Sequence, residues 1–215
     1  MELQYPLAVV TPTLDGDVLA SLAAADVWFT TGQLQRVVAG RSVQGIRRTL
    51  VRLVEQGIVD TDQVGQTRRY RLNQDHLAAP AIVILANLRG ELLQRIDRHV
   101  ESWPVAPIYA AVFGSAARGQ MRPDSDIDVF IVRPDFLEDE EDWDRQLAEF
   151  ARLLTKWTGN DGRILQMTEQ EVATGAGSDP ILTSIAREGL TIYGQPAWLR
   201  TLLNGSRVVH GATNQ

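Results

Sequence analysis

The 215-residue sequence contains no cysteine and only three widely separated histidines. The absence of cysteine excludes disulfides, thiolate zinc sites and cysteine nucleophiles, and the scattered histidines exclude a histidine-rich metal cluster. Any bound metal is therefore expected to have oxygen ligands. No apolar run approaches the roughly eighteen residues of a membrane-spanning helix, and the N-terminus lacks the charged-then-apolar order of a signal peptide, so we expect a soluble, cytoplasmic protein without a membrane partner.

The charges are distributed unevenly along the chain. Residues 30–75 carry eight arginines against four acids, whereas residues 76–215 carry thirteen basic residues against nineteen acids. The hydrophobic content of 44% is enough to bury a core, and the length allows one large or two small domains. We therefore expect a mixed α+β protein in which a basic module is followed by an acidic one.

A turn of small residues, followed by two alternating aspartates, is the most informative segment. The apolar run 108–113 predicts a buried strand that ends at Gly114 and Ser115, where backbone N–H groups can approach a phosphate closely. A second strand begins with Asp126 and Asp128, which project to one face because strand side chains alternate. Two adjacent carboxylates suit Mg²⁺, which binds one or two carboxylates together with substrate phosphates. The other interpretation is a tight hairpin with two solvated aspartates.

This combined pattern, Gly-Ser, then Arg-Gly, then Ser-Asp-x-Asp on an apolar strand, resembles the small bacterial branch of the DNA polymerase β-like nucleotidyltransferases over residues 105–200. The resemblance implies a small mixed sheet flanked by helices, an NTP substrate, and Mg²⁺ or Mn²⁺ as cofactor. It implies that Asp126 and Asp128 are catalytic and ligate the metal. It also implies nucleotide-binding roles for Gly114, Ser115, Arg118 and Ser125.

The family pattern includes a third carboxylate, on the strand next to the Asp-x-Asp strand, which acts as general base or completes the metal site. Gln166 stands at the corresponding position of the next predicted strand. A glutamine does not accept a proton at neutral pH and offers a metal only one neutral oxygen. Asp161 is an alternative if its loop folds inward. Glu169 is another, although Thr168 and Glu171 fit a capping box for the following helix.

Residues 13–75 predict three short helices followed by a β hairpin. Ser42 is the predicted N-cap of the third helix and Gly57 its end, and apolar residues form one stripe along this helix while basic residues lie away from it. The hairpin has a predicted polar turn at 62–65 and an arginine-bearing return strand at 68–72. This order of elements predicts a small helical module with a protruding hairpin.

The same order resembles the winged helix-turn-helix of bacterial transcription regulators. The resemblance implies that residues 42–56 enter a DNA major groove and that the return strand belongs to a wing beside the phosphates. Arginine suits both positions because it can bind guanine edges or phosphates. The implied DNA-binding residues are Ser42, Gln44, Arg47, Arg48, Arg52, Arg68 and Arg69. The other interpretation is a module for protein contact or dimerisation with a solvated arginine face.

An apolar stripe from Pro80 to Ser102 predicts one long connector helix, whose breadth also suits a homodimer. The predicted layout is a winged helix-turn-helix domain at 1–76, a connector helix at 77–103, a nucleotidyltransferase domain at 104–203 and a flexible tail at 204–215. Later strands of the nucleotidyltransferase domain are predicted at 163–168 and 190–193.

Two functions are compatible with these patterns. The first is Mg-dependent transfer of a nucleoside monophosphate from an NTP to a hydroxyl of a small molecule, an RNA end or a protein, with the winged helix recruiting the enzyme to DNA or to a partner. The second is a winged-helix transcription regulator or antitoxin-like autorepressor whose nucleotidyltransferase-like domain only binds nucleotide. The intact Gly-Ser and Asp-x-Asp elements favour the first, and Gln166 favours the second.

Overall fold

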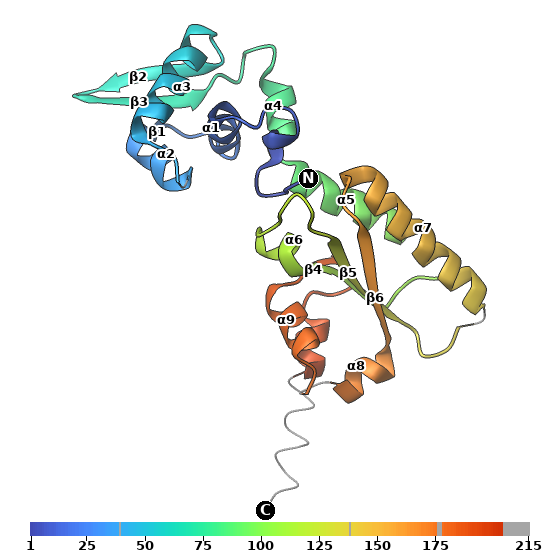
Figure 1. Ribbon diagram of the computed structural model, residues 1–215. Coiled ribbons are helices and arrows are strands. Elements are labelled where there is room, and N and C mark those ends of the chain that lie inside the picture. Colours follow the sequence, from blue (N-terminus) through green and yellow to red (C-terminus); the bar gives the residue numbers. More distant parts are fainter. Residues whose placement is uncertain (39, 138, 176–177, 204–215) are drawn as a thin grey trace, which may run out of the picture. The chain divides into compact units, whose positions relative to one another are not determined.

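The computed structural model describes residues 1–38, 40–137, 139–175 and 178–203, and the predicted tail at 204–215 lies outside these residues (Figure 1). The chain divides into an N-terminal unit, Glu2–Glu91, and a C-terminal unit that runs from Leu92 onward and includes Met1. Each unit contains helices and one sheet, so the predicted mixed α+β class is confirmed. Within the described part of the chain, no helix is long and apolar enough to cross a membrane.

The N-terminal unit packs its helices against a three-stranded antiparallel sheet with the order β1-β3-β2. Its elements are η1 (Pro6–Val9), α1 (Leu14–Ala23), β1 (Phe29–Thr30), α2 (Thr31–Val37), α3 (Val43–Glu55), β2 (Val59–Val64), β3 (Thr67–Leu72) and α4 (Ala79–Ala86). The core of this unit joins the apolar stripe of α3 to the inner face of β3, through buried residues that include Ile46, Leu50, Leu53, Tyr70 and Leu72. The three predicted helices and the hairpin are therefore present.

Local capping explains where α2 and α3 begin. Thr30 and Gln33 form a capping box, in which the Thr30 side chain accepts from the Gln33 N–H and the Gln33 side chain accepts from the Thr30 N–H. Ser42 Oγ accepts from the Gly45 N–H at 3.0 Å and so caps α3, as predicted.

The hairpin turn is tighter than the sequence predicted. Pairing continues to Val64 and Thr67, so the loop contains only Gly65 and Gln66 rather than residues 62–65. Gly65 has φ of +60°, a conformation that two-residue hairpin loops require and that glycine adopts without steric cost. Asp62, which the sequence predicted in the turn, is instead paired with Arg69 between β2 and β3.

The predicted single connector helix is wrong, because the chain forms two helices. Helix α4 ends at Ala86, and α5 (Leu88–Glu101) begins after Asn87, whose φ and ψ of −100° and 21° leave the helical region. The Asn87 side chain folds against Gly90, where an added Cβ would lie 2.5 Å from Asn87 Oδ1. The boundary between the two units falls within α5, between Glu91 and Leu92.

The C-terminal unit contains a four-stranded mixed sheet with the order β6-β5-β4-β7. Its further elements are β4 (Tyr109–Phe113), α6 (Gly114–Arg118), β5 (Ile127–Arg133), α7 (Glu140–Thr158), β6 (Gly162–Thr168), α8 (Glu169–Gly175), α9 (Pro180–Glu188) and β7 (Leu190–Tyr193). Strands β5 and β6 are parallel, and β4 is antiparallel to both β5 and β7. The predicted small mixed sheet flanked by helices is confirmed.

Helices cover both faces of this sheet (Figure 1). On one face, Phe130 and Val132 of β5 pack with Val172 of α8 and with Leu182 and Ile185 of α9. On the opposite face α7 lies along β6. Since β5 is buried on both faces over most of its length, its apolar run is nearly continuous, and only Asp128 and the terminal Arg133 carry polar side chains.

Candidate active site

Asp126 and Asp128 stand at the start of β5, on the sheet face that α8 and α9 cover. Both carboxylates are partly buried, while Ile127 and Val129 on either side of Asp128 are fully buried. This is the alternation that the sequence predicted. The strand begins at Ile127, so Asp126 immediately precedes the sheet.

Gly114 lies against Asp128. The last residue of β4, Phe113, pairs with Asp128, and the chain then turns into α6 at Gly114, whose φ is +68°. An added Cβ on Gly114 would lie 2.5 Å from Asp128 Oδ2. The Gly114-Ser115 turn and the Asp128 carboxylate are therefore adjacent parts of one site, which requires glycine for both its backbone conformation and its lack of a side chain.

Two arginines border the aspartates. Arg163 of β6 is in register with Asp128, and its guanidinium lies 2.9 Å from Asp126 Oδ2. Burial raises the pKa of Asp128, the charge of Asp126 raises it further, and Arg163 and Arg118 act in the opposite direction. The predicted site residue Arg118 is thus within electrostatic range of Asp128.

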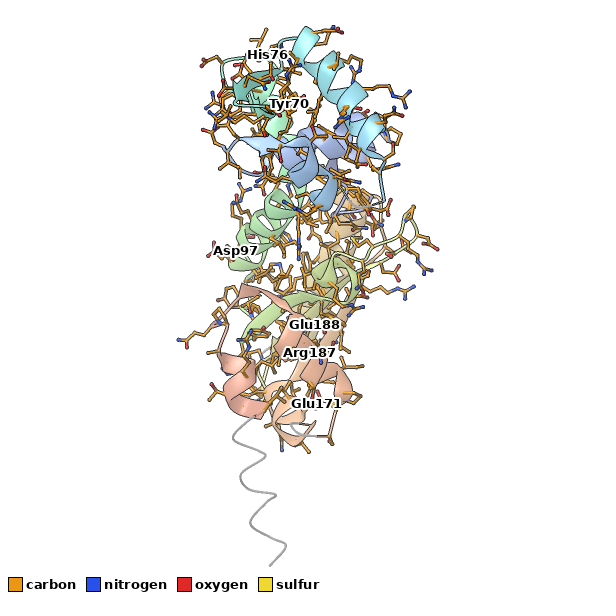
Figure 2. The ribbon with its side chains drawn as sticks, turned by 90° about the vertical axis from the view of Figure 1, so that its left-hand side faces the viewer. Tyr70, His76, Asp97, Glu171, Arg187 and Glu188 are labelled. Carbon is orange, nitrogen blue, oxygen red and sulfur yellow. The ribbon has the colours of Figure 1, made fainter. Side chains whose placement is uncertain are left out.

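Glu188, at the end of α9, contributes a further acid that sequence reasoning did not find. Its carboxylate is 3.4 Å from Arg118 and also pairs with the neighbouring Arg187 (Figure 2). These two arginines hold the pKa of Glu188 below its usual range, Arg187 being the main cause. No local spacing signals this acid, because α9 reaches the α6 turn only through the tertiary fold.

The loop that carries Asp126 is held by another residue that the sequence did not identify. Asn160 is only 3% exposed, and its Nδ2 donates to the carbonyl oxygens of Ser125 at 2.7 Å and Pro123 at 3.4 Å. The predicted nucleotide-binding hydroxyl of Ser125 accepts from the Arg122 N–H at 2.8 Å and so stabilises the same loop. The sequence shows only an asparagine between two glycines of a turn, and its burial, which requires hydrogen-bond partners, is evident only in the structure.

Gln166 is not the third member of the site, which corrects the prediction. Gln166 is in register with Ile131, three residues beyond Asp128, so it projects to the opposite face of the sheet. There its Oε1 accepts a 2.8 Å hydrogen bond from Trp143 Nε1 of α7. The residue of β6 that lies on the same face as Asp128, and beside it, is Arg163.

Asp161 precedes β6, and its backbone carbonyl accepts from the Ile127 N–H at 2.8 Å. Its side chain is exposed. Among the described residues, no three acids or histidines come close enough together to hold a metal ion. Within the described part of the chain, Asp126 and Asp128 are therefore brought together without a third carboxylate.

The residues present fit a magnesium ion that is held partly by its substrate. Two neighbouring carboxylates face the same side, their mutual repulsion contributes to the raised pKa of Asp128, and the turn at Gly114 adjoins one of them. Mg²⁺ needs only one or two carboxylates when substrate phosphates and waters complete its octahedron. A site built wholly from protein ligands would need more oxygen donors than these two aspartates supply.

In the N-terminal unit, the predicted DNA-binding residues separate into two sets. Gln44, Arg47 and Arg48 lie on the exposed face of α3, and Arg68 lies on the side of β3 that also carries the core residue Tyr70. Since Tyr70 packs in one core with α3, Arg68 and α3 share one side of the sheet. Ser42, the N-cap of α3, is exposed as well.

The remaining two candidates are engaged elsewhere. Arg52 pairs with Asp15 of α1. Arg69 projects to the other side of β3, where Asp62 accepts two hydrogen bonds from it at 2.6 and 2.9 Å and its guanidinium lies 4.9 Å from the centre of the Trp28 ring. Arg69 is thus placed away from the α3 surface.

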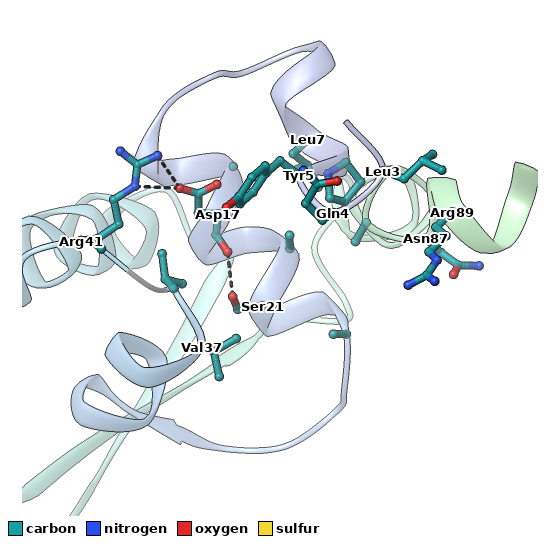
Figure 3. A pocket seen from close by; sticks show the side chains of 17 residues that line it. Leu3, Gln4, Tyr5, Leu7, Asp17, Ser21, Val37, Arg41, Asn87 and Arg89 are labelled. Carbon is teal, nitrogen blue, oxygen red and sulfur yellow. Dashed lines mark hydrogen bonds and ion pairs between the residues drawn. The ribbon is translucent and has the colours of Figure 1, made fainter. Parts of the chain in front are cut away.

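A cavity of about 620 Å³ lies within the N-terminal unit, lined by residues of η1, α1 and the ends of α2 and α4 (Figure 3). At its border Arg41 donates two hydrogen bonds to Asp17 Oδ2, at 3.1 and 2.8 Å, and Ser21 Oγ donates to the Asp17 carbonyl oxygen at 2.8 Å. The residues that line this cavity are different from those around Gly114 and the two aspartates, so it is separate from the candidate active site.

Three solved structures illustrate the similarities of this chain. A toxin–antitoxin structure with AMP-PNP is 16% identical, covering 55% of this chain and 86% of that chain with a TM-score of 0.40. The toxin–antitoxin MntA-HepT is 16% identical, covering 58% and 86% with a TM-score of 0.34. TrmBL2, an archaeal chromatin protein, is 15% identical, covering 86% and 77% with a TM-score of 0.29. All three TM-scores are too low to support an argument about fold or function.

No curated protein matches the sequence. Residues 93–161 match the family model described as a nucleotidyltransferase domain. The matched stretch contains the Gly114 turn, both aspartates and Asn160, and it ends before Arg163. The segment that carries the candidate active site is therefore similar to a nucleotidyltransferase domain.

Proposed function

We propose that this chain is a Mg²⁺-dependent nucleotidyltransferase that transfers a nucleoside monophosphate from an NTP to a hydroxyl acceptor. The observation that carries this proposal is the contact between the Gly114 turn and the Asp128 carboxylate. A phosphate bound at the turn would lie next to the two carboxylates, within reach of a metal that they hold. The similarity of residues 93–161 to a nucleotidyltransferase domain supports the same chemistry.

The roles of the residues follow from their positions. Backbone N–H groups at Gly114 and Ser115 would bind the β and γ phosphates, and Arg118 would balance their charge at the end of α6. Asp126 and Asp128 would hold the metal, which when bound neutralises charge on the phosphates and on the leaving pyrophosphate. Asn160 and Ser125 would keep Asp126 in place by fastening its loop. Catalysis by such a site consists mainly of positioning and charge stabilisation.

We further propose that residues 1–76 form a winged helix-turn-helix that binds DNA, that residues 77–103 connect the modules and that residues 104–203 form the nucleotidyltransferase domain. The order of three helices and a hairpin supports this, as does the strand order β1-β3-β2. The binding surface would comprise Ser42, Gln44, Arg47, Arg48 and Arg68. A homodimer and a protein acceptor remain predictions from the sequence.

A second candidate is a DNA-binding regulator whose C-terminal unit binds nucleotide without transferring it. The observation that favours it is the cation Arg163 beside Asp128, in a register where a third carboxylate would complete a catalytic set. An arginine at that position would weaken metal binding by repulsion while leaving the phosphate turn intact.

One experiment separates the two functions. The purified protein is incubated with Mg²⁺, each α-labelled NTP and a cell lysate as acceptor source, and Asp126→Asn and Asp128→Asn variants are run in parallel. Transfer of label by the wild-type protein, lost in both variants, supports the enzyme. Nucleotide binding without transfer supports the regulator, and transfer that persists in either variant contradicts the assigned site. A gel shift with the protein's own upstream DNA at several salt concentrations tests the N-terminal module.

A further inference from the structure

We propose that Arg163 is a specificity-determining residue of the transfer reaction, which selects an acceptor whose hydroxyl lies beside a phosphate group. This inference rests on the nucleotidyltransferase function proposed above and specifies the class of its acceptor. The inference rests on the strand order, in which the Gly114 turn and Arg163 lie on opposite sides of β5.

The sheet order determines the direction from which the acceptor must approach. The Gly114 turn follows β4, whereas Arg163 belongs to β6, and β5 with Asp128 lies between these two strands. In phosphoryl and nucleotidyl transfer the attacking and leaving oxygens are roughly in line, on opposite sides of the phosphorus. If the pyrophosphate leaves on the side of Gly114, the acceptor hydroxyl enters on the side of β6.

Arg163 lies on that side of the site. It is in register with Asp128, its guanidinium reaches Asp126 Oδ2 at 2.9 Å, and 68% of its side chain is exposed. Such a side chain can turn from Asp126 toward a bound molecule without leaving the site. A planar guanidinium binds phosphate through two parallel hydrogen bonds, which makes arginine well suited to an acceptor that carries one.

The charges around the site favour the same acceptor. Arg118, the other arginine that acts on Asp128, belongs to α6 on the Gly114 side, where the proposed function assigns it to the phosphates of the NTP. Once Asp126 and Asp128 are committed to a metal, the charge of Arg163 is available on the acceptor side. A cationic acceptor, such as an aminoglycoside, would be repelled there, whereas a phosphorylated alcohol or the end of a nucleic-acid strand would be attracted.

The reaction balances without any further reactant. The acceptor oxygen forms a bond to the α-phosphorus, and the bond between the α-phosphorus and the bridging oxygen breaks. Pyrophosphate leaves with the electron pair, and the hydroxyl proton passes to solvent. Arg163 takes no part in these bond changes, since its role is to hold the phosphate next to the attacking hydroxyl.

Binding measurements on the full chain test the inference. With the protein saturated by Mg²⁺ and a non-hydrolysable NTP analogue, Kd values are measured for two pairs of probes. The first pair is glycerol 3-phosphate and glycerol, and the second is an RNA trinucleotide and the same trinucleotide with neutral methylphosphonate linkages. The two pairs separate a small phosphorylated alcohol from a nucleic-acid end as the source of the phosphate.

Three variants accompany the wild-type protein. Arg163→Gln should weaken binding of the preferred phosphorylated probe about tenfold or more, as expected for a charge-assisted hydrogen bond, and Arg163→Lys should recover part of this loss. Arg152→Gln is the matched control, because Arg152 is an exposed arginine of α7 that pairs with Glu149 at 3.7 Å. It should leave all probes unaffected.

The outcomes keep this inference distinct from the proposed function. Equal binding of charged and neutral probes, or an unchanged preference in Arg163→Gln, overturns the role of Arg163. The nucleotide Kd, measured first in the same samples, reports separately on the site itself. If the Mg²⁺–nucleotide complex binds wild-type protein but not Asp126→Asn, a negative result with the probes counts against the acceptor class alone.

Discussion

Gly114 and Asp128 are in such close contact that a methyl group on Gly114 would lie 2.5 Å from Asp128 Oδ2. The pairing of Phe113 with Asp128 in the β4–β5 ladder produces this contact, because it brings the residue after Phe113 over the carboxylate. The φ of +68° at Gly114 then directs the chain into α6. The sheet thereby fixes the Gly114 turn, the proposed phosphate site, against Asp128, a proposed metal ligand.

Substitution Gly114→Ala should destabilise the protein and weaken nucleotide binding together. The positive φ costs a non-glycine residue about 1–2 kcal/mol, and the new methyl group must displace the Asp128 carboxylate. Thermal unfolding and titration with a Mg²⁺–nucleotide analogue measure the two effects.

Gly65→Ala provides the control for backbone strain. Gly65 has φ of +60°, and nothing lies within 4 Å of its added Cβ. This variant should lose stability but bind nucleotide as the wild-type protein does. Nucleotide affinity that is unchanged in Gly114→Ala would contradict the proposed role of the turn.

Asn160→Ala should lower nucleotide affinity although Asn160 lies outside the proposed contacts. The substitution removes the amide that binds the Ser125 and Pro123 carbonyls, which costs about 1 kcal/mol for lost hydrogen bonds that are partly buried and frees the loop before Asp126. Asn73→Ala, which removes a similar 2.8 Å bond to the Gly57 carbonyl in the N-terminal unit, is the control. Equal nucleotide affinity in both variants would count against the positioning role.

Asp128→Asn should make the protein more stable at neutral pH while abolishing transfer. Because burial and Asp126 raise the pKa of Asp128 above its ordinary value of 3.8, the folded state binds this proton more tightly than the unfolded state, and the ionised carboxylate costs stability at pH 7. Each 1 kcal/mol regained raises Tm by about 2–4 °C for a protein of this size.

The advantage of Asp128→Asn should shrink as the pH falls through the raised pKa of Asp128 toward 3.8, since the wild-type carboxyl then becomes neutral as well. Thermal unfolding of both proteins across this range, without added metal, measures the difference. A variant that is less stable than wild type at every pH would contradict this account of the site.

His99 should make stability depend on pH near neutrality. Its ring stacks on Phe150, with centroids 5.5 Å apart, and lies edge-on to Trp157, and burial lowers the pKa of His99 while the charge of Glu149 opposes this. The unfolded chain therefore binds the proton first, and stability should fall as the pH drops below 6.5 toward the lowered pKa. Urea unfolding of wild type and His99→Phe should show a smaller pH slope in the variant, and identical slopes would exclude His99 as the cause.

Arg47→Gln and Arg48→Gln should each weaken DNA binding and reduce the salt dependence of log K by about 1 if the residue contacts a phosphate. Both residues lie on the exposed face of α3. Arg69→Gln is the comparison, because Arg69 is paired with Asp62 on the other side of β3 and should contribute little. Gel shifts at several salt concentrations measure all three, and a larger loss in Arg69→Gln would place the DNA on the opposite side of the hairpin.

Secondary structure followed largely from local sequence. The capping residue Ser42 and the period-two pattern around Asp128 act over a few residues, and α3 and β5 formed where they predicted a helix and a strand. The one long helix predicted between the modules was wrong for a local reason that the apolar pattern does not show. Asn87 interrupts the connector by leaving helical φ and ψ, although the apolar stripe continues past it.

The candidate site was only partly predictable. The sequence predicted Asp126 and Asp128 on one face because strand side chains alternate, and it predicted Gly114 at a strand end because the apolar run 108–113 stops there. From the sequence we expected Gln166 beside the two aspartates. This expectation was wrong, because the apolar pattern of β6 does not reveal the register between two parallel strands. A shift of three residues exchanges the face, so only the paired structure shows Arg163 in that place.

The sequence by itself excluded thiolate metal ligands, because it has no cysteine, and it predicted two carboxylates side by side, because every second residue of a strand lies on the same face. Only the tertiary structure decided which residues surround the two aspartates. Arg163 of β6 reaches Asp126, Glu188 of α9 pairs with Arg118, and Asn160 fastens the loop before Asp126. All three contacts depend on strand register and helix packing between residues distant in sequence.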